Sequence, residues 1–467
     1  MAAFKNKHSK RKKNLPSPDE PQPVQLVEQH LVHQGDFYFD RIDQAAFAAK
    51  NLYNKTNYLV RQAYIFEHRY IGYGGTYHLV KDSAEYRALP RKVSNQVLLQ
   101  VDHDWQSFFG AMKAWREDPS KFLGRPRLPG YKHKSQGRNL LVYEAGAIGK
   151  KALKEGLIKP SQLGILIPTQ QKNVNQVRVV PRQNCYVIEV VYTVIPQKAE
   201  GLRDDLYAGL DVGVNNLAAL TSNKVGFSPY LVNGRPLKAI NQWYHKARAY
   251  FQSLLPVGRY LSQRIIDLTN KRNRQIKHYL HLASKRIIDL LVAEGIGTLI
   301  IGKNKHWKQK VELGKQTNQN FVSIPFAQFI AMLTYKAKLV GIRVIEQEEA
   351  YTSKSSFLDL EPICKQKTYR GQRVERGLFR AGDGRLINAD VNGSYNILRK
   401  AIPDAFKNGL AGIILHPVRL FLEHPHKACH GYRKHTNKKP QTPLGNGVGA
   451  PQFVPSVALG RYEQLVA

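Results

Sequence analysis

The stretch YAGLDVGVNNLAALTSN (residues 207–223) contains two apolar runs separated by a Gly/Asn-rich turn. This pattern predicts two antiparallel strands joined by a short connection. A third strand is expected near residues 229–232, and a long amphipathic helix from about residue 261 to residue 293. Three antiparallel strands followed by a helix therefore open the second half of the chain.

A strand–helix–strand unit follows directly. TLII (residues 298–301) is typical of a buried strand, a helix begins after Ser323 and ends at Gly341, and IRVIE (residues 342–346) predicts the next strand. A connection of this length makes the two strands parallel, with a right-handed crossover. With a closing helix in INADVNGSYNILRKAI (residues 387–402), the order is that of an α/β, RNase H-like fold.

The first 200 residues predict a separate β module with a helical insertion. VQLVEQHLVH (residues 24–33) and the alternating runs within residues 163–195 have strand character. Between Val97 and Trp115 apolar residues recur every three or four positions, which predicts one face of an amphipathic helix. The boundaries that we expect are 1–22 for a disordered basic arm, 23–200 for the β module with its helical insertion at about 40–120, 201–405 for the RNase H-like domain with an insertion at about 350–388, and 406–467 for a C-terminal tail.

The charge of the chain indicates its class of partner. The 467 residues carry 71 Lys+Arg against 35 Asp+Glu, a formal net charge of +36. Such an excess repels itself unless a polyanion binds it, so nucleic acid is the expected partner and an anionic membrane surface is the alternative. The basic, Pro-rich N-terminus has no secretory signal, and no apolar run reaches the roughly 18 residues of a transmembrane helix. We expect a soluble, intracellular protein.

The cysteines exclude two kinds of stabilisation. Cys185, Cys364 and Cys429 lie far apart and no CxxC occurs, so neither a disulfide framework nor a cysteine-rich zinc ribbon is expected. The His/Cys cluster at residues 424–430 matches no metal-site spacing, and we interpret it as part of a solvated tail.

Two acids occupy positions where acids are rare. Asp211 lies inside an apolar strand, between Leu210 and Val212, where an unpaired carboxylate is costly. Asp390 lies at the start of the last predicted helix, where a capping role is the alternative. Held close together, the two carboxylates could bind Mg²⁺, which prefers oxygen ligands, and a two-metal site would support phosphodiester cleavage.

A third acid is expected at the same edge of the sheet. The TLII strand ends at Gly302 without an acid, but the neighbouring strand offers Glu348 and Glu349 near its own end. Parallel neighbours present their carboxyl ends at one edge, and strand alternation favours Glu348, or Glu349 if the strand has already ended. A solvent-exposed acidic cluster is the alternative. The expected catalytic residues are Asp211, Glu348, Glu349 and Asp390, and the expected metal ligands are Asp211, Glu348 and Asp390.

Cations on loops and helix faces are candidates for phosphate contacts. They lie in a Pro/Gly-rich loop at residues 122–138, on the polar face of the long helix, and after the TLII strand. The expected nucleic-acid-binding residues are Arg125, Arg127, Lys132, Lys271, Arg272, Arg274, Lys303 and Lys308. A solvated surface is the alternative for each of them.

The chain resembles the TnpB (OrfB) family of transposon-encoded, RNA-guided DNA endonucleases, which is related to type V CRISPR effectors. The motifs that carry the resemblance are GLDVGVNNLAALT (209–221), VNGRPLK (232–238), LHLASKRIIDLL (280–291), TLIIGKN (298–304) with the following Trp307 and Lys308, NQNFVSIPF (318–326), YTSK (351–354) and NADVNGSYNIL (388–398). The resemblance covers about residues 206–402. The first 200 residues match mainly in layout, as a wedge β module with a helical recognition insertion.

The resemblance implies a RuvC-like nuclease that binds a guide RNA from its own insertion sequence and cleaves double-stranded DNA with Mg²⁺ in the cytoplasm of a prokaryote, at the nucleoid. Asp211 matches the first catalytic Asp of the family and Asp390 the last. Gly302 stands where the family has its catalytic Glu, and Ser356 and Asp359 stand where it has its first zinc-ribbon cysteines. Either Glu348 or Glu349 takes over the acidic role, which we favour, or the site is inactive; the insertion is expected to hold no zinc.

Three other functions remain open at this stage. Gly302 and the missing ribbon cysteines would suit an RNA-guided DNA-binding protein that does not cleave, such as a repressor. The charge alone would suit a general RNA-binding protein. A DDE-type transposase also uses three acids on an RNase H-like fold. The sequence gives neither the guide RNA nor the DNA motif beside the target, and it leaves the oligomeric state open.

Overall fold

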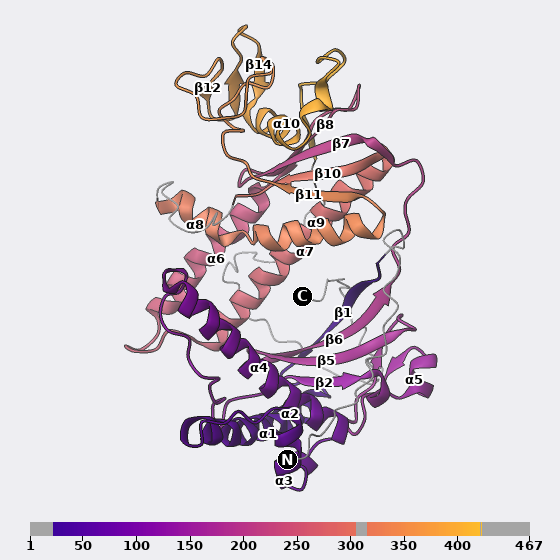
Figure 1. The fold of residues 1–467 in the computed structure, drawn as a ribbon, viewed down its shortest axis with the longest axis vertical. Coiled ribbons are helices and arrows are strands. Elements are labelled where there is room, and N and C mark those ends of the chain that lie inside the picture. The colour runs from indigo at the N-terminus through magenta and orange to yellow at the C-terminus, as the bar shows by residue number, and fades with distance from the viewer. Residues whose placement is uncertain (1–21, 305–314, 421, 423–467) are drawn as a thin grey trace, which may run out of the picture.

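The computed structural model describes residues 22–304, 315–420 and 422 (Figure 1). The predicted basic arm up to residue 21, Lys308 and the tail from residue 423, including the cluster at 424–430, lie outside the described residues. The described chain forms two lobes, each built on its own β-sheet. Within these residues no helix combines the length and the apolar character that crossing a membrane requires.

The first lobe packs helices against an antiparallel sheet. The sheet has the order β1 (Val24–His33), β6 (Cys185–Val194), β5 (Val174–Arg182) and β2 (Leu141–Glu144). The helices are α1 (Phe39–Phe66), α2 (Tyr73–Val80), α3 (Ala84–Arg87) and α4 (Arg91–Glu117). Short elements complete the lobe: α5 (Lys150–Lys154), β3 (Leu157–Ile158) and β4 (Ile167–Pro168). The predicted helix across residues 97–115 is confirmed, because Val97, Val101 and Trp105 are buried on one face of α4.

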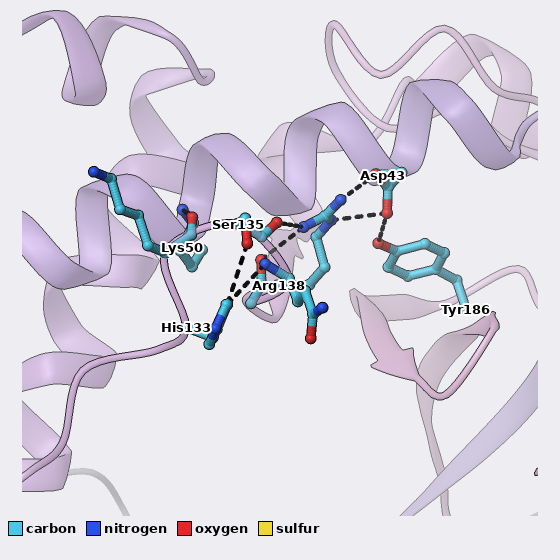
Figure 2. A network of polar contacts seen from close by, with 9 residues as sticks. Asp43, Lys50, His133, Ser135, Arg138 and Tyr186 are labelled. Atoms are coloured by element: carbon cyan, nitrogen blue, oxygen red, sulfur yellow. Dashed lines mark hydrogen bonds and ion pairs between the residues drawn. The ribbon is translucent and has the colours of Figure 1, made fainter. Parts of the chain in front are cut away.

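A polar network ties the helices of this lobe to the sheet (Figure 2). The Arg138 guanidinium donates to both carboxylate oxygens of Asp43 on α1, at 2.8 and 2.6 Å. The Tyr186 hydroxyl on β6 donates to the same carboxylate at 2.7 Å. The hydrogen bonds from Arg138 hold the pKa of Asp43 below its ordinary value, although burial works in the opposite direction. The network thereby fixes the end of the basic loop between α4 and β2.

The second lobe is a six-stranded sheet with helices on both faces. The strand order is β11 (Arg343–Gln347), β10 (Ile296–Gly302), β7 (Arg203–Val212), β8 (Asn216–Ser222), β9 (Tyr230–Asn233) and β15 (Val418–Leu420). β7, β8 and β9 are antiparallel, whereas β10 and β11 run parallel to β7. The helices are α6 (Arg235–Ser253), α7 (Gln263–Ala293), α8 (Lys315–Ser323), α9 (Phe326–Leu339) and α10 (Ala389–Ala401). The expected mixed α/β architecture is present.

Alternation along β7 decides what each face of the sheet carries. Ala208 and Leu210 pack into the core under α7 and α9, so Gly209 and Asp211 point to the opposite face, where α10 lies. A Cβ on Gly209 would collide with the Ser394 carbonyl oxygen of α10. Glycine therefore lets α10 approach β7 closely, and the Ser394 hydroxyl donates to the Gly209 carbonyl at 2.8 Å.

The elements predicted for this lobe are present, but α6, α8 and β15 have no counterpart in the prediction. The helix expected after Ser323 is α9, which begins at Phe326, and Ser323 itself ends α8. The helix expected at 261–293 is α7, and the strand expected at 342–346 is β11, shifted by one residue. The tail prediction is wrong for residues 406–420, since Phe406 is buried at the end of a 3₁₀ turn (Pro403–Phe406) and β15 adds a parallel edge strand beside β9. A three-residue strand is too short for its alternation to be visible in a sequence.

The insertion between β11 and α10 is a small antiparallel sheet of its own. It comprises β12 (Gln372–Glu375), β13 (Leu378–Arg380) and β14 (Leu386–Asn388), in that order. In Figure 1 it lies at the far end of the second lobe, beside α10.

Candidate active site: an acidic edge beside a cationic cleft

Asp211 projects from the end of β7 toward α10. Gly393 on that helix leaves room for it, because a Cβ at Gly393 would come within 2.8 Å of Asp211 Oδ2. Burial raises the pKa of Asp211 well above its ordinary value, and the charges of Glu349 and Asp390 raise it further. Arg373 opposes this rise. Asp390 and a third acid, Glu349, therefore both lie close enough to Asp211 for their charges to act on it.

Asp390 lies in the first turn of α10 but does not cap that helix. Asn388 is the cap, and its side chain accepts hydrogen bonds from the backbone N–H groups of Asp390 and Val391 at 3.0 and 3.2 Å. The carboxylate of Asp390 instead accepts a hydrogen bond from Asn216 Nδ2 of β8 at 2.7 Å. The capping alternative for Asp390 is thus excluded, and its side chain is available to the site.

Glu349 lies two residues beyond the end of β11 and turns back toward the sheet. Asn304 holds it in place: Nδ2 of Asn304 donates to Glu349 Oε2 at 3.1 Å, and Oδ1 accepts the Glu349 backbone N–H at 3.1 Å. In the described part of the chain, Glu349 Oε1 is buried without a hydrogen-bond partner. Burial raises the pKa of this carboxyl to about 7.

Glu348, which strand alternation favoured, lies outside this group. β11 ends at Gln347, and Glu348 is exposed. Glu348 is not among the main causes of the raised pKa of Asp211. The expectation that Glu348 faces the other acids is wrong, because alternation carries it to the face of Ile342 and Val344, under α7 and α9, whereas Asp211 lies on the α10 face.

The place of Gly302 explains how Glu349 fits. Gly302 ends β10, and β10 lies between β7 and β11. A Cβ on Gly302 would collide with Oε1 of Glu349, and its Cγ would be only 2.8 Å away. The carboxyl of Glu349 thus occupies the space that a side chain at Gly302 would need.

We call Asp211, Glu349 and Asp390 the acidic site. Their oxygens are the hard ligands that Mg²⁺ prefers, and the unpaired Oε1 of Glu349 is an acceptor that a cation would satisfy. Among the described residues no three His, Cys, Asp or Glu side chains already form a closed ligand set. The three carboxylates would therefore have to draw together when they bind an ion.

A cleft of about 750 Å³ opens beside the acidic site. The turn at residues 213–216 and Asp390 both line it. Five cations line it: Arg235, Lys238, Arg373, Arg376 and Arg419. Sequence reasoning did not single out these residues, since they come from α6, the insertion and β15 and only the fold brings them together.

The cations that the sequence did predict are distributed elsewhere. Arg125, Arg127, Lys271 and Arg274 are exposed on the first lobe's basic loop and on α7. Lys303 pairs with Glu346 at 2.7 Å on the surface. Lys132 stacks its ammonium over the Tyr53 ring at 4.6 Å and lines a second, smaller cavity near Arg138.

Arg272 is used inside the protein. Its guanidinium donates to Asn241 Oδ1 at 2.8 and 2.6 Å and to the Ser323 carbonyl at 2.5 Å. It also lies over the Tyr244 ring, and burial lowers its pKa. Arg272 therefore joins α6, α7 and the end of α8, which leaves it fewer donors for a phosphate than the exposed Lys271 has.

Comparisons with known proteins match both halves of this site. The OrfB_IS605 family, described as a probable transposase, matches residues 188–308, which include Asp211 and Gly302. The Cas12f1-like TNB domain family matches residues 326–397, which include Glu349 and Asp390. The TnpB-like protein ORF457 of Acidianus two-tailed virus is 22% identical over 78% of this chain and 83% of its own length.

Two further relatives are nucleases or nucleic-acid complexes by name. The CRISPR-associated endodeoxyribonuclease Cas12f2 of Micrarchaeota archaeon (strain CG1_02_47_40) is 23% identical over 48% of this chain and 44% of its own length. Among solved structures, a Cas12f1–sgRNA–target DNA complex has a TM-score of 0.48, with 16% identity over 78% of this chain and 82% of that chain. The predicted resemblance to TnpB (OrfB) proteins is confirmed by the family matches and the TnpB-like relative, and the Cas12f1-like match agrees with the expected relation to type V CRISPR effectors.

Proposed function

We propose that this chain, with its confirmed resemblance to TnpB and Cas12f proteins, is an RNA-guided DNA endonuclease. The observation that carries the proposal is the acidic site: three carboxylates from separate parts of the chain converge beside a cationic cleft. An acidic group next to a basic groove suits a reaction in which a phosphodiester is held by cations and hydrolysed at metal-bound carboxylates.

The second lobe is proposed to be the RNase H-like (RuvC-like) nuclease domain. The order β9–β8–β7–β10–β11, with the first three strands antiparallel and the last two parallel to β7, supports this assignment. Residues 201–405 would make up this domain together with β15, and the insertion at 350–388 would belong to it. The acidic site then lies where the carboxyl ends of β7, β10 and β11 meet, with α10 closing the edge.

Asp211, Glu349 and Asp390 would hold Mg²⁺ in this site. When bound there, Mg²⁺ would activate a water molecule and stabilise the leaving oxygen of the phosphodiester. Asn304 fixes the carboxyl of Glu349, and Asn216 fixes that of Asp390, so the two ligands at the ends of the group are already oriented. Glu349 would supply the carboxylate that is absent at Gly302.

The cleft would hold the strand that is cut. Arg235, Lys238 and Arg419 come from one wall, and Arg373 and Arg376 of the insertion come from another. Their charges would bind successive phosphates and place one of them over the acidic site. Arg373 is near enough to Asp211 to influence its pKa, so it would also lie close to the phosphate that reacts.

The first lobe is proposed to bind the guide RNA and the DNA beside the target. Residues 23–200 would be the wedge module, with α1 to α4 as its recognition helices, and Arg125, Arg127 and Lys132 would contribute phosphate contacts. A net charge of +36 suits a guide RNA and a guide–target duplex, since such effectors recognise both largely through their backbones. The substrate would be DNA of a prokaryotic nucleoid.

The decisive experiment is to purify the protein from its host cells, sequence the RNA that comes with it, and incubate the complex with matching DNA and Mg²⁺. We expect one dominant RNA from the flank of its own gene, and cleavage that Asp211→Ala abolishes. DNA binding without cleavage would identify a repressor-like protein instead. DNA excision and joining by the chain without RNA would identify a transposase.

A further inference from the structure

The insertion between β11 and α10 lacks the size to fold independently. Its three strands span only three or four residues each, and every residue of β12 is exposed. Its apolar contribution is small: Phe357, Leu358 and Phe379 pack near Tyr395 of α10. A sheet of this size needs a cross-link to hold its two halves together.

Zinc does not fit this insertion. Ser356 and Asp359 occupy the first predicted ligand pair, and the tight turn opposite them runs from Ala381 to Gly384. These positions offer one hydroxyl and one carboxylate, and neither Ala381 nor Gly384 has a side-chain donor, whereas a structural zinc site needs four Cys or His ligands. The nearby Cys364 is a lone, exposed thiol.

Glu361 joins the two halves instead. Its side chain is almost fully buried, and each carboxylate oxygen accepts a backbone N–H from a different segment. Oε2 accepts from Ser356 at 2.8 Å, and Oε1 accepts from Arg370 at 2.8 Å. Hydrogen bonds to an ionised acceptor are about twice as strong as neutral ones, so this carboxylate bridges the first turn to the segment that leads into β12.

Asp359 adds a second bridge, on the side of the facing turn. Its Oδ2 accepts the backbone N–H of Gly382 at 2.7 Å. A Cβ at Gly382 would come within 3.1 Å of the other oxygen, so the turn lies directly against the carboxylate. Asp359 therefore connects the two segments that a metal ion would otherwise join, and Glu361 connects the first of them to the segment before β12.

Helix α10 anchors the first turn. Asn392 accepts the Phe357 N–H at 2.9 Å and donates to the Ser355 carbonyl at 3.0 Å. Asn396 donates to the carbonyls of Ser355 and Thr352, at 2.7 and 3.0 Å. The same helix carries Asp390, and β14 leads directly into it. The bridges from Asp359 and Glu361 therefore add to the β12–β13–β14 ladder in setting the position of β12 relative to the acidic site.

We propose that Asp359 and Glu361 form a carboxylate clamp that replaces a metal cross-link and positions Arg373 and Arg376 at the cleft. The clamp has two consequences. The insertion holds its shape without any metal ion, and the two acids act on the reaction only through the arginines of β12 and the β12–β13 turn. The second consequence rests on the proposed nuclease function, whereas the first does not.

The first test is limited trypsin digestion of the full-length protein, because Arg370, Arg373 and Arg376 are cut if the insertion opens. We expect a strong zinc chelator to leave the wild-type cutting rate unchanged. Glu361→Gln should raise that rate by roughly tenfold or more, because an amide cannot accept both N–H groups. Asp383→Asn is the matched control, since Asp383 is an exposed acid of the same insertion whose ion pair and hydrogen bonds are with the neighbouring Arg385.

Two results would overturn the clamp: faster digestion of the wild type after chelation, or equal rates for Glu361→Gln and Asp383→Asn. Loss of the near-ultraviolet circular dichroism signal in Glu361→Gln would mean that this variant does not fold. Asp359→Asn is then tested in its place, because Asp359 lies nearer the surface and the substitution removes only one of the bridges. Asp359→Asn should still speed digestion at the insertion, and no change in its rate would refute the proposal.

The second test measures single-turnover DNA cleavage by the RNA-bound protein. We expect Glu361→Gln and Arg373→Ala each to slow cleavage by roughly tenfold while the affinity for target DNA changes less. The double variant should be no slower than the slower single variant, because both act through one group. Multiplying effects would refute the positioning role. If the wild type itself does not cleave, the nuclease proposal fails and the digestion test still decides the clamp.

Discussion

Two groups of acids lie beside α10, and they differ in how their oxygens are used. In the carboxylate clamp, both oxygens of Glu361 and one of Asp359 accept backbone N–H groups. In the acidic site, Glu349 Oε1 has no partner among the described residues, and Asp211 has a strongly raised pKa because burial and two like charges oppose its ionisation.

Acids whose oxygens all have hydrogen-bond donors stabilise the fold, whereas acids with an unsatisfied oxygen are suited to binding a cation. A buried carboxylate with satisfied oxygens stabilises the protein as it stands, whereas a crowded group with an unsatisfied oxygen costs stability until a counter-ion binds. Both groups bring acids together in a chain whose net charge is +36. The hydrogen bonds of the carboxylate oxygens, and not the number of acids, distinguish the clamp from the acidic site.

The largest expected effect separates Glu349 from its neighbour. Glu349→Ala should reduce the single-turnover cleavage rate on the order of 10²–10³-fold, the cost typical of a preorganised charge-stabilising group. Glu348→Ala is the matched control, since Glu348 is exposed, and its rate should remain within about twofold of the wild type. Similar losses of cleavage rate in the two variants would place Glu348 in the acidic site and contradict the assignment of Glu349 as the third acid.

Moving the carboxylate from Glu349 to Gly302 tests whether the third acid can come from β10 instead of from the residue after β11. Gly302→Glu alone should be inactive and less stable, because the new side chain would collide with Glu349 Oε1 and with Ile397 of α10. Gly302→Glu combined with Glu349→Gly should cleave at least about tenfold faster than Glu349→Gly alone. If the double variant is no faster, the end of β10 cannot present a carboxylate to this site.

The thermal stability of the metal-free protein gives a smaller effect of opposite sign. Asp211→Asn should raise the Tm in EDTA by a few degrees, since it removes a buried carboxylate that Glu349 and Asp390 both repel. Added Mg²⁺ should raise the Tm of the wild type and not that of the variant. Glu361→Gln should lower the Tm in the same buffer. A higher Tm for this variant would contradict the view that the clamp stabilises the fold while the acidic site destabilises it.

The smallest effect concerns Asp43, a carboxylate whose partner is an arginine. Asp43→Asn should cost about 1 kcal/mol of unfolding free energy at pH 7. Because the folded pKa of Asp43 lies below its ordinary value of 3.8, its contribution is complete above about pH 5 and is lost as the pH falls through the folded pKa. Unfolding in urea across pH 3–7 should therefore show the two proteins converging at low pH, and a constant gap would contradict this pairing.

Much of the second lobe could be predicted because its signals are local. The apolar run around Asp211, Gly341 at the end of α9 and the DVN sequence at Asp390 each carry their own pattern. The position of the third acid could not be predicted, because alternation tells which residues of β11 share a face but not which face α10 covers. Glu348 shares the face of Val344, under α7 and α9, and the acids lie on the other face, with Ile345.

The cleft and the clamp could not be predicted for a related reason. Arg235, Arg373 and Arg419 are separated by long stretches of chain, and only the packing of α6, the insertion and β15 gathers them. Glu361 reads as an ordinary acid beside a proline, and its role depends on two backbone N–H groups that face it in three dimensions. Sequence patterns report periodicity and chemistry, and they do not report which backbone groups lack partners.

The collision between a side chain at Gly302 and the carboxyl of Glu349 bears on how such chains are classified. A sequence search that requires an acid at the end of β10 would classify this protein as a catalytically inactive relative. Because β10 and β11 are parallel neighbours in register from Thr298 to Gly302, a carboxylate can reach one point in space from either of them. Related sequences that lack an acid at the end of β10 should therefore be searched again for a carboxylate that follows β11.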